Sequence, residues 1–237
     1  MVEQFFPLTQ SIEPESIGPL ILLSGPICCG KTSLLFQFAI NCALDSSSEV
    51  VFICNKGKLE SKPPFLSEAI DPSSDVFERI QMKYVEDYED IKKYFSAFHL
   101  HVRFPSAVII DDFGGFFNDR YCQQKYGNAR GRDLAMVRTL SLCQDAVSHA
   151  KKLQPHKSCT ILLSDLQQGD SPQLLFIYRR LIKCFFTIEG NQDKRVHVPN
   201  EPSAEVCRSK AYFPHCIQVY IPYVLLRILA FEILRKK

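Results

Sequence analysis

Four residues near the N-terminus have the types and spacing of a phosphate-binding loop. Gly25 and Gly30 enclose four residues and are followed by Lys31 and Thr32, in the stretch SGPICCGKTSLLF. In this pattern the backbone N–H groups of a glycine-containing turn surround a polyphosphate at a helix N-terminus, and the lysine reaches its outer oxygens. The pattern therefore predicts that the chain binds a nucleotide.

The flanking sequence supplies the elements that such a loop needs. Residues 17–25 are a short apolar run that predicts a buried strand, and residues 32–44 carry apolar side chains at helical spacing. We predict Lys31 as a catalytic residue as well as a binding residue. The predicted nucleotide-binding set is the loop with the first helical turn: Gly25, Pro26, Ile27, Cys28, Cys29, Gly30, Lys31, Thr32 and Ser33.

A pair of carboxylates provides candidate metal-binding and catalytic groups. Asp111 and Asp112 directly follow the apolar run AVII, residues 107–110. The Mg²⁺ that accompanies a nucleotide needs a hard anionic ligand at the end of a strand. We predict Asp111 and the Thr32 hydroxyl as magnesium ligands, on a strand next to that of the phosphate loop. Asp112 is predicted to polarise water. The alternative is a pair that merely caps the following glycine turn.

Strands and helices alternate along the rest of the chain. Predicted strands cover residues 49–55, 106–117, 158–168 and 183–190, and predicted helices cover 87–100, 132–153 and 171–182. Such alternation predicts an α/β fold with a mostly parallel sheet between helical layers. In the 237 residues we expect an N-terminal extension (1–16), a core domain (17–190), and a polar linker with an apolar C-terminal segment (191–237).

Composition limits the classes of partner and of metal site. The formal net charge is +2, so any contact with nucleic acid must come from a local basic patch. The ten cysteines include no CxxC pair, which predicts reduced thiols. The C-terminal apolar run is interrupted by charged residues and a proline, which favours a docking helix over a membrane span. A zinc site is not expected, because no recognised ligand spacing relates His197, Cys207, His215 and Cys216.

Two fragments resemble motifs of other nucleotide-binding enzymes. Asp112 begins a DFG triplet, but the chain has no HRD catalytic loop and no upstream GxGxxG loop. The fragment NKGK, residues 55–58, lacks the aspartate of the GTPase NKxD motif and precedes DxxG in the chain. Protein kinases and GTPases are therefore excluded. A nucleotide kinase stays an alternative, although no arginine-rich lid segment is visible between the third and fourth predicted strands.

Taken together, these blocks resemble the RecA/recombinase superfamily. The stretch GPICCGKT is similar to the RecA form GPESSGKT, and residues 77–95, SAVIIDDFGGFF and CTILLSDLQQ follow in recombinase order. Within the superfamily the chain is similar to SWIM-domain-protein-associated ATPases, recombinase paralogues of Shu-type complexes. This resemblance spans about residues 17–190. It implies a RecA-like core that uses ATP and Mg²⁺, and a nuclear role in homologous recombination and double-strand break repair. It also implies single-stranded DNA, a SWIM-type zinc-finger protein, and recombinases or their paralogues as partners.

The sequence departs from the recombinase pattern at the second predicted strand. RecA-type enzymes end this strand in a glutamate that orients water, in a form like DTEG, whereas CNKG places Lys56 there. Because a protonated lysine cannot act as a base, hydrolysis is expected to be slow or to depend on Asp112, or else Glu60. Lys56→Glu is then predicted to raise turnover. The open alternative is a non-catalytic nucleotide-binding scaffold. Gln167 or Gln168 either senses the terminal phosphate or is simply solvated.

Residues 118–132 lie where recombinases carry a DNA-facing loop. This stretch combines cations with aromatic rings, the mixture that single-strand grooves use for phosphates and for stacked bases. The alternative is a solvated polar loop. The candidate DNA-binding residues are Arg120, Tyr121, Lys125, Tyr126, Arg130 and Arg132.

Overall fold

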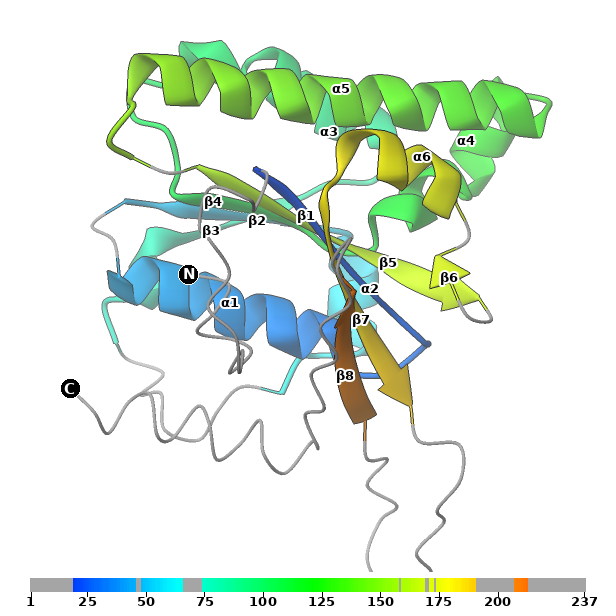
Figure 1. The fold of residues 1–237 in the computed structure, drawn as a ribbon, viewed down its shortest axis with the longest axis horizontal. Helices are drawn as coiled ribbons and strands as arrows, with labels where there is room; N and C mark the ends of the chain where they lie inside the picture. The colour runs from blue at the N-terminus through cyan, green and yellow to red at the C-terminus, as the bar shows by residue number, and fades with distance from the viewer. Residues whose placement is uncertain are drawn as a thin grey trace, which may run out of the picture.

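A parallel sheet of apolar strands forms the centre of the computed structural model (Figure 1). The structure describes residues 19–45, 48–65, 74–157, 159–168, 171–172, 174–190 and 207–212. In sheet order, the parallel strands are β3 (Ile80–Tyr84), β2 (Val50–Cys54), β4 (Ala107–Ile110), β5 (Thr160–Gln168), β1 (Leu20–Gly25) and β7 (Cys184–Gly190). β1, β2 and β4 are buried at every position, as expected of strands covered on both faces. The predicted α/β fold is confirmed.

Helices cover both faces of the sheet. One face packs against α1 (Lys31–Asp45), and the other packs under α3 (Tyr88–Ser96), α5 (Ala129–Leu153) and α6 (Leu175–Leu181) (Figure 1). Side chains of β1 alternate between the two layers: Ile21 and Leu23 belong to the core beneath α1, whereas Leu20 and Leu22 belong to the core beneath α5. The sheet is thus buried between two apolar layers.

The strand order corrects one expectation about the magnesium ligands. β4, which precedes Asp111, does not neighbour β1, because β5 lies between the two. Adjacent strands are about 4.8 Å apart, so the ends of β1 and β4 are about 10 Å apart. A group that bridges them must therefore come from the phosphate loop or from the start of α1.

Several short elements differ from the sequence-based prediction. The sequence does not predict β3, since Gln81 and Lys83 are exposed and only Ile80 is buried in this outermost described strand. The predicted strand 106–117 ends at Ile110, after which the chain turns into the 3-10 helix η5 (Phe113–Phe117). The other short elements are α2 (Lys56–Ser61), η3 (Phe77–Arg79), η4 (Phe98–Leu100), α4 (Arg120–Lys125), β6 (Ser171–Pro172) and β8 (Cys207–Tyr212).

The segment predicted as a loop at 118–132 is largely helical. It contains α4 and the first turn of α5, and each helix has a side-chain cap. Asp119 accepts a hydrogen bond from the Cys122 N–H at 2.7 Å, and Asn128 accepts one from the Gly131 N–H at 2.7 Å. Such caps satisfy N–H groups that a helix start leaves unpaired, which explains why this polar stretch folds into helices.

The C-terminal part of the core extends further than predicted. β8 lies within the predicted linker region 191–237, yet it pairs antiparallel with β7. The helix predicted from Ser171 begins at Leu175, because Ser171 and Pro172 form β6 against the end of β5. The predictions for residues 1–16 and for the apolar segment after 212 lie outside the described residues, as do the side chains of the zinc candidates.

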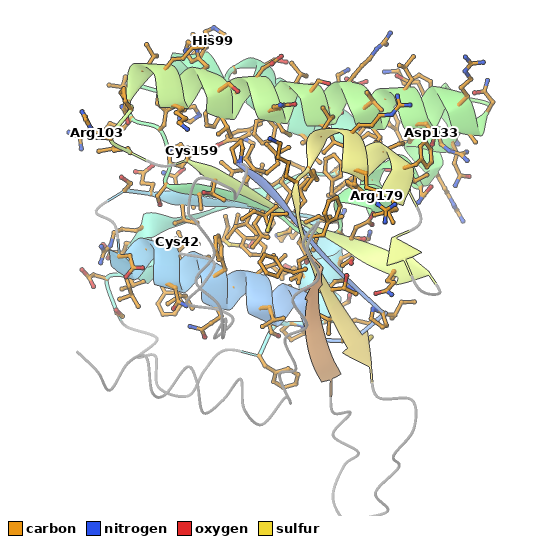
Figure 2. The ribbon with its side chains drawn as sticks, in the orientation of Figure 1. Cys42, His99, Arg103, Asp133, Cys159 and Arg179 are labelled. Atoms are coloured by element: carbon orange, nitrogen blue, oxygen red, sulfur yellow. The ribbon has the colours of Figure 1, made fainter. Side chains whose placement is uncertain are left out.

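The structure describes the side chains of most of the cysteines as free thiols. No disulfide joins the eight cysteines whose side chains the structure describes. Cys42 lies between α1 and the sheet (Figure 2), where burial raises the pKa of its thiol to about 12. Across the described part of the chain, no three His, Cys, Asp or Glu side chains group into a metal site. None of the described helices combines the length and the apolar character that a membrane span requires.

Candidate nucleotide-binding site

The phosphate loop connects β1 to the first residue of α1, as its motif predicts. Gly30 has a φ of 86°, which a glycine adopts without strain. Cys28 also has a positive φ, of 60°. A Cβ atom on Gly25 would lie 2.7 Å from the Cys29 sulfur and 3.0 Å from the Ile188 Cβ. The loop therefore needs glycine at both motif positions, and it leads directly into a helix whose first N–H groups are available to an anion.

The side chain of Lys31 folds back onto the backbone of this loop. Its ammonium donates hydrogen bonds to the carbonyl oxygens of Gly25, at 2.9 Å, and Pro26, at 2.6 Å. It also lies 3.7 Å from the sulfur of Cys29. Burial raises the pKa of the Cys29 thiol, and the nearby ammonium offsets only part of this effect, so Cys29 is a neutral thiol. The Lys31 ammonium is thus held against the backbone carbonyl groups at the start of the loop.

The Thr32 hydroxyl and the Asp111 carboxylate meet despite the strand between them. Thr32 Oγ1 donates to Asp111 Oδ2 at 2.9 Å, because α1 carries the threonine from β1 toward β4. Ser164, on the intervening strand β5, donates to Asp111 Oδ1 at 2.7 Å and accepts the Asp112 N–H at 2.8 Å. The predicted pair of magnesium ligands is therefore assembled, and Ser164 is a positioning residue that the sequence did not reveal.

The electrostatics of Asp111 suit a cation site. Burial raises the pKa of its carboxyl group, and the hydrogen bonds from Ser164 and Thr32 offset this effect in part. A hydroxyl and a carboxylate are the hard oxygen ligands that Mg²⁺ prefers. The residues present therefore fit a nucleotide-bound Mg²⁺, whose charge would also remove the cost of burying this carboxylate.

Asp112 is held in an unusual backbone conformation and in an ion pair. Its φ of 56° and ψ of 48° lie in the left-handed region, which aspartate tolerates better than most residues. Its Oδ2 lies 2.5 Å from the ammonium of Lys58 on α2. A Cβ atom on Gly115 would overlap the Asp112 carboxylate, so a glycine at this position avoids a steric clash with that side chain. The candidate water-polarising group is therefore engaged by a lysine.

Lys58, and not Lys56, is the cation of α2 beside the paired carboxylates. The Lys56 ammonium lies 3.7 Å from Glu60 Oε1 and 5.9 Å from the ring centre of Tyr84, at the end of β3. The structure thus directs Lys56 to Glu60 and Tyr84, and the expectation that Lys56→Glu raises turnover stays a prediction. Glu60, the alternative base, is the partner of Lys56 in this ion pair, and its role stays a prediction.

A further carboxylate, Asp165, lies on β5 next to the last residues of β1. It is opposite Ser24 in the sheet register and is 5% exposed. Its Oδ2 accepts a hydrogen bond from the Tyr178 hydroxyl at 2.6 Å, and its Oδ1 accepts one from the Leu166 N–H at 2.7 Å. The sequence signal was the pair SD directly after an apolar run, two positions before Gln167, the first of the two glutamines considered as phosphate sensors.

Asp165 makes the stability of the fold depend on pH. Burial raises its pKa from 3.8 to about 6, and the hydrogen bond from Tyr178 offsets the rise only in part. Between about pH 4 and 6 the folded chain keeps a proton that the unfolded chain has lost, so the free energy of unfolding falls as pH rises through this window. We expect a loss of about 3 kcal/mol from this group, measured by urea unfolding. Asp165→Asn should flatten the profile, and an unchanged profile would contradict this assignment.

Gln167 lies near the end of β5 and is partly buried, while the side chain of Gln168 lies outside the described residues. The hypothesis that either glutamine senses a terminal phosphate stays a prediction.

The candidate DNA-binding residues divide into two groups. Tyr121, Lys125 and Tyr126 come together with Tyr88: the Lys125 ammonium lies 5.7 to 6.0 Å from the centres of the three tyrosine rings. Lys125 also binds Glu89 Oε1 at 2.6 Å. Burial acts to raise the pKa of Glu89, but the hydrogen bonds from Lys125, Tyr88 and Lys92 outweigh it and lower the pKa to about 2.

The arginines of this region lie at the start of α4 and at the start of α5. Arg120 begins α4 and is exposed, Arg130 is exposed in the first turn of α5, and Arg132 is half-buried one residue beyond Gly131. Exposed cations next to partly exposed aromatic rings are compatible with a single-strand groove.

Comparisons with known proteins support the fold. No protein-family model and no curated protein matches the chain. Among solved structures the chain is similar to the KaiC-like protein PH0186 from the hyperthermophilic archaeon Pyrococcus horikoshii OT3, with a TM-score of 0.57 and 12% sequence identity. The match covers 87% of this chain and 84% of that chain, and at this identity it concerns the fold alone. The chain has the RecA-like P-loop fold.

Proposed function

We propose that this chain binds ATP with Mg²⁺ and hydrolyses it weakly. The observation that carries the proposal is the hydrogen bond between Thr32 Oγ1 and Asp111 Oδ2, 2.9 Å long, next to the Lys31 ammonium. The Thr32 hydroxyl and the Asp111 carboxylate follow two strands that are not neighbours, and they meet beside the lysine of a phosphate loop. This arrangement suits the binding of a metal-bound triphosphate.

The roles of the individual groups follow from their positions. The N–H groups at the start of α1 and the Lys31 ammonium bind the phosphate oxygens. Thr32 and Asp111 hold the Mg²⁺, which, when bound, neutralises charge that develops on the phosphates. Asp112 orients the attacking water once its carboxylate leaves Lys58, and Ser164 keeps both aspartates in place. Slow turnover is expected, because the candidate water-orienting group is engaged by an ion pair.

Steady-state ATP hydrolysis by the purified chain tests this proposal, measured with and without single-stranded DNA. We expect slow, DNA-stimulated turnover that Lys31→Ala reduces to background, because this change removes the ammonium from the loop. Lys56→Ala on α2 is the matched control, since its ammonium contacts Glu60 and Tyr84 instead. Wild-type turnover equal to that of Lys31→Ala would contradict hydrolysis.

The second candidate function is a non-catalytic nucleotide-binding scaffold. The ion pair between Lys58 and Asp112 favours it, because a carboxylate held by an ammonium is a poor partner for water. ATP binding without turnover above that of Lys31→Ala would select this function, and the bound nucleotide would then stabilise the fold and its complexes.

We further propose that the chain acts in the nucleus in homologous recombination repair, with a SWIM-type zinc-finger protein and with recombinases or their paralogues. The support is the sequence resemblance to recombinase paralogues. For single-stranded DNA, additional support comes from the exposed cations and rings of α4 and the start of α5. The DNA arm of the hydrolysis assay tests the nucleic-acid part directly.

A further inference from the structure

Residues 55–65, which we call the α2 strap, contact both the phosphate loop and the start of α1. At the start of the strap, Asn55 caps α2 by accepting the Lys58 N–H at 3.0 Å. Farther along, the Lys62 ammonium lies 3.3 Å from the Cys28 sulfur at the loop. The Phe65 N–H then donates to Ser33 Oγ, at the start of α1, at 2.9 Å. The strap thus connects the end of β2 to both the loop and the helix that follows it.

The lysines of the strap face different surroundings. Lys58 contacts Asp112 and Lys62 contacts Cys28, so both ammonium groups lie on the side of the strap nearest the phosphate loop. Lys56 instead contacts Glu60 and the ring of Tyr84. Lys56 and Lys58 are only two positions apart, about half a turn of α2, so their side chains leave the helix in different directions.

Lys58 is connected to the predicted metal-binding residues through Asp112. Its partner Asp112 is the next residue after Asp111, and Asp111 in turn binds the Thr32 hydroxyl. The side chain of Lys58 is 59% exposed and that of Asp112 is 37% exposed, so water competes for the ion pair and it can exchange partners. A phosphate oxygen carries more charge than a carboxylate oxygen, and lysine is a flexible point charge that can turn toward it.

We propose that Lys58 binds the terminal phosphate of a nucleoside triphosphate and thereby makes the site prefer triphosphate to diphosphate. This inference rests on the proposed nucleotide-binding function. The lysine exchanges Asp112 for the phosphate when a triphosphate is present, whereas a diphosphate offers no group at that position. The exchange also frees Asp112, so the group that orients water becomes available when there is a phosphate to attack.

Binding measurements on Lys58→Ala and Lys56→Ala test this proposal. Dissociation constants are measured by calorimetry, with Mg²⁺, for a non-hydrolysable ATP analogue and for ADP. We expect Lys58→Ala to weaken the analogue by about tenfold or more and to leave ADP within about twofold, since one charge-assisted hydrogen bond is lost for the analogue alone. Lys56→Ala, on the same helix, should leave both constants unchanged.

Asp112→Asn provides a test of opposite sign. It removes the anion that competes for Lys58, so the preference for the analogue over ADP should increase, provided that thermal unfolding shows an intact fold. Equal weakening of both nucleotides by Lys58→Ala, or no weakening of either, would overturn the role of Lys58, as would an unchanged preference in Asp112→Asn. Failure of the wild-type chain to bind either nucleotide would instead refute the nucleotide-binding function itself.

Discussion

Asp111→Asn will lower ATP turnover at least about 100-fold while leaving the free energy of unfolding unchanged or higher. Turnover falls because an amide cannot supply the anionic ligand through which Mg²⁺ stabilises charge on the phosphates, a contribution of several kcal/mol. Stability does not fall, because the carboxylate is buried and its pKa is raised by that burial. The amide has nearly the same shape and carries no charge that must be buried, and its NH₂ group donates to the hydroxyl of Thr32 or Ser164 that it faces, so that hydrogen bond is reversed and not lost.

Hydrolysis and urea unfolding of the same Asp111→Asn preparation separate these two effects. Glu60→Gln is the matched control, because it makes the same chemical change on the strap in a side chain paired with Lys56. It should leave both quantities unchanged. If Asp111→Asn kept its turnover, the assignment of Asp111 as a metal ligand would be wrong, whatever happened to stability.

The sequence predicted the parts of the site that are local in the chain. The phosphate loop needs glycines, a lysine and a threonine within one short stretch, with a strand before it and a helix after it, so its pattern is visible without the fold. Asp111 was found because an apolar strand that ends in a carboxylate is also a local feature. The central strands were predicted for the same reason, since burial on both faces requires uninterrupted apolar runs.

The parts that sequence reasoning missed depend on contacts between distant segments. Ser164 reaches Asp111 from a strand 53 positions away in the chain, and Lys58 reaches Asp112 across 54 positions. The local pattern does not distinguish Lys58 from Lys56, because both lie in one polar turn. They differ only in the direction in which their side chains leave α2. β3 was missed because an outer strand carries polar side chains that interrupt the apolar pattern.

The functional groups gather where the parallel strands end. Asp111 follows β4, Ser164 and Asp165 lie toward the end of β5, and the phosphate loop follows β1. Since parallel strands direct their carboxyl ends to one edge of a sheet, residues far apart in sequence are concentrated there. The α2 strap, which follows β2, then lies over the same edge. The order of the strands is thus what converts separate local motifs into one site.

Gly114→Ala will destabilise the fold by about 2 to 3 kcal/mol, an effect typical of an overpacked core. Gly114 is buried in η5, and a Cβ atom there would overlap both carboxylate oxygens of Asp165. Asp165 cannot move aside freely, because Tyr178 and the Leu166 N–H hold its two oxygens. Gly127→Ala is the control, since nothing lies within 4 Å of a Cβ atom at that position. Urea unfolding of the two variants should differ by nearly the whole effect.

A double-mutant cycle tests whether the overlap with Asp165 is the cause. Asp165→Ala alone should also destabilise the fold, because it leaves the buried Tyr178 hydroxyl without its acceptor. Combined with Gly114→Ala, however, it removes the group with which the new methyl collides, so the double variant should lose less stability than the sum of the single variants. Strict additivity would show that Gly114 is needed for another reason, since independent sites add and colliding ones do not.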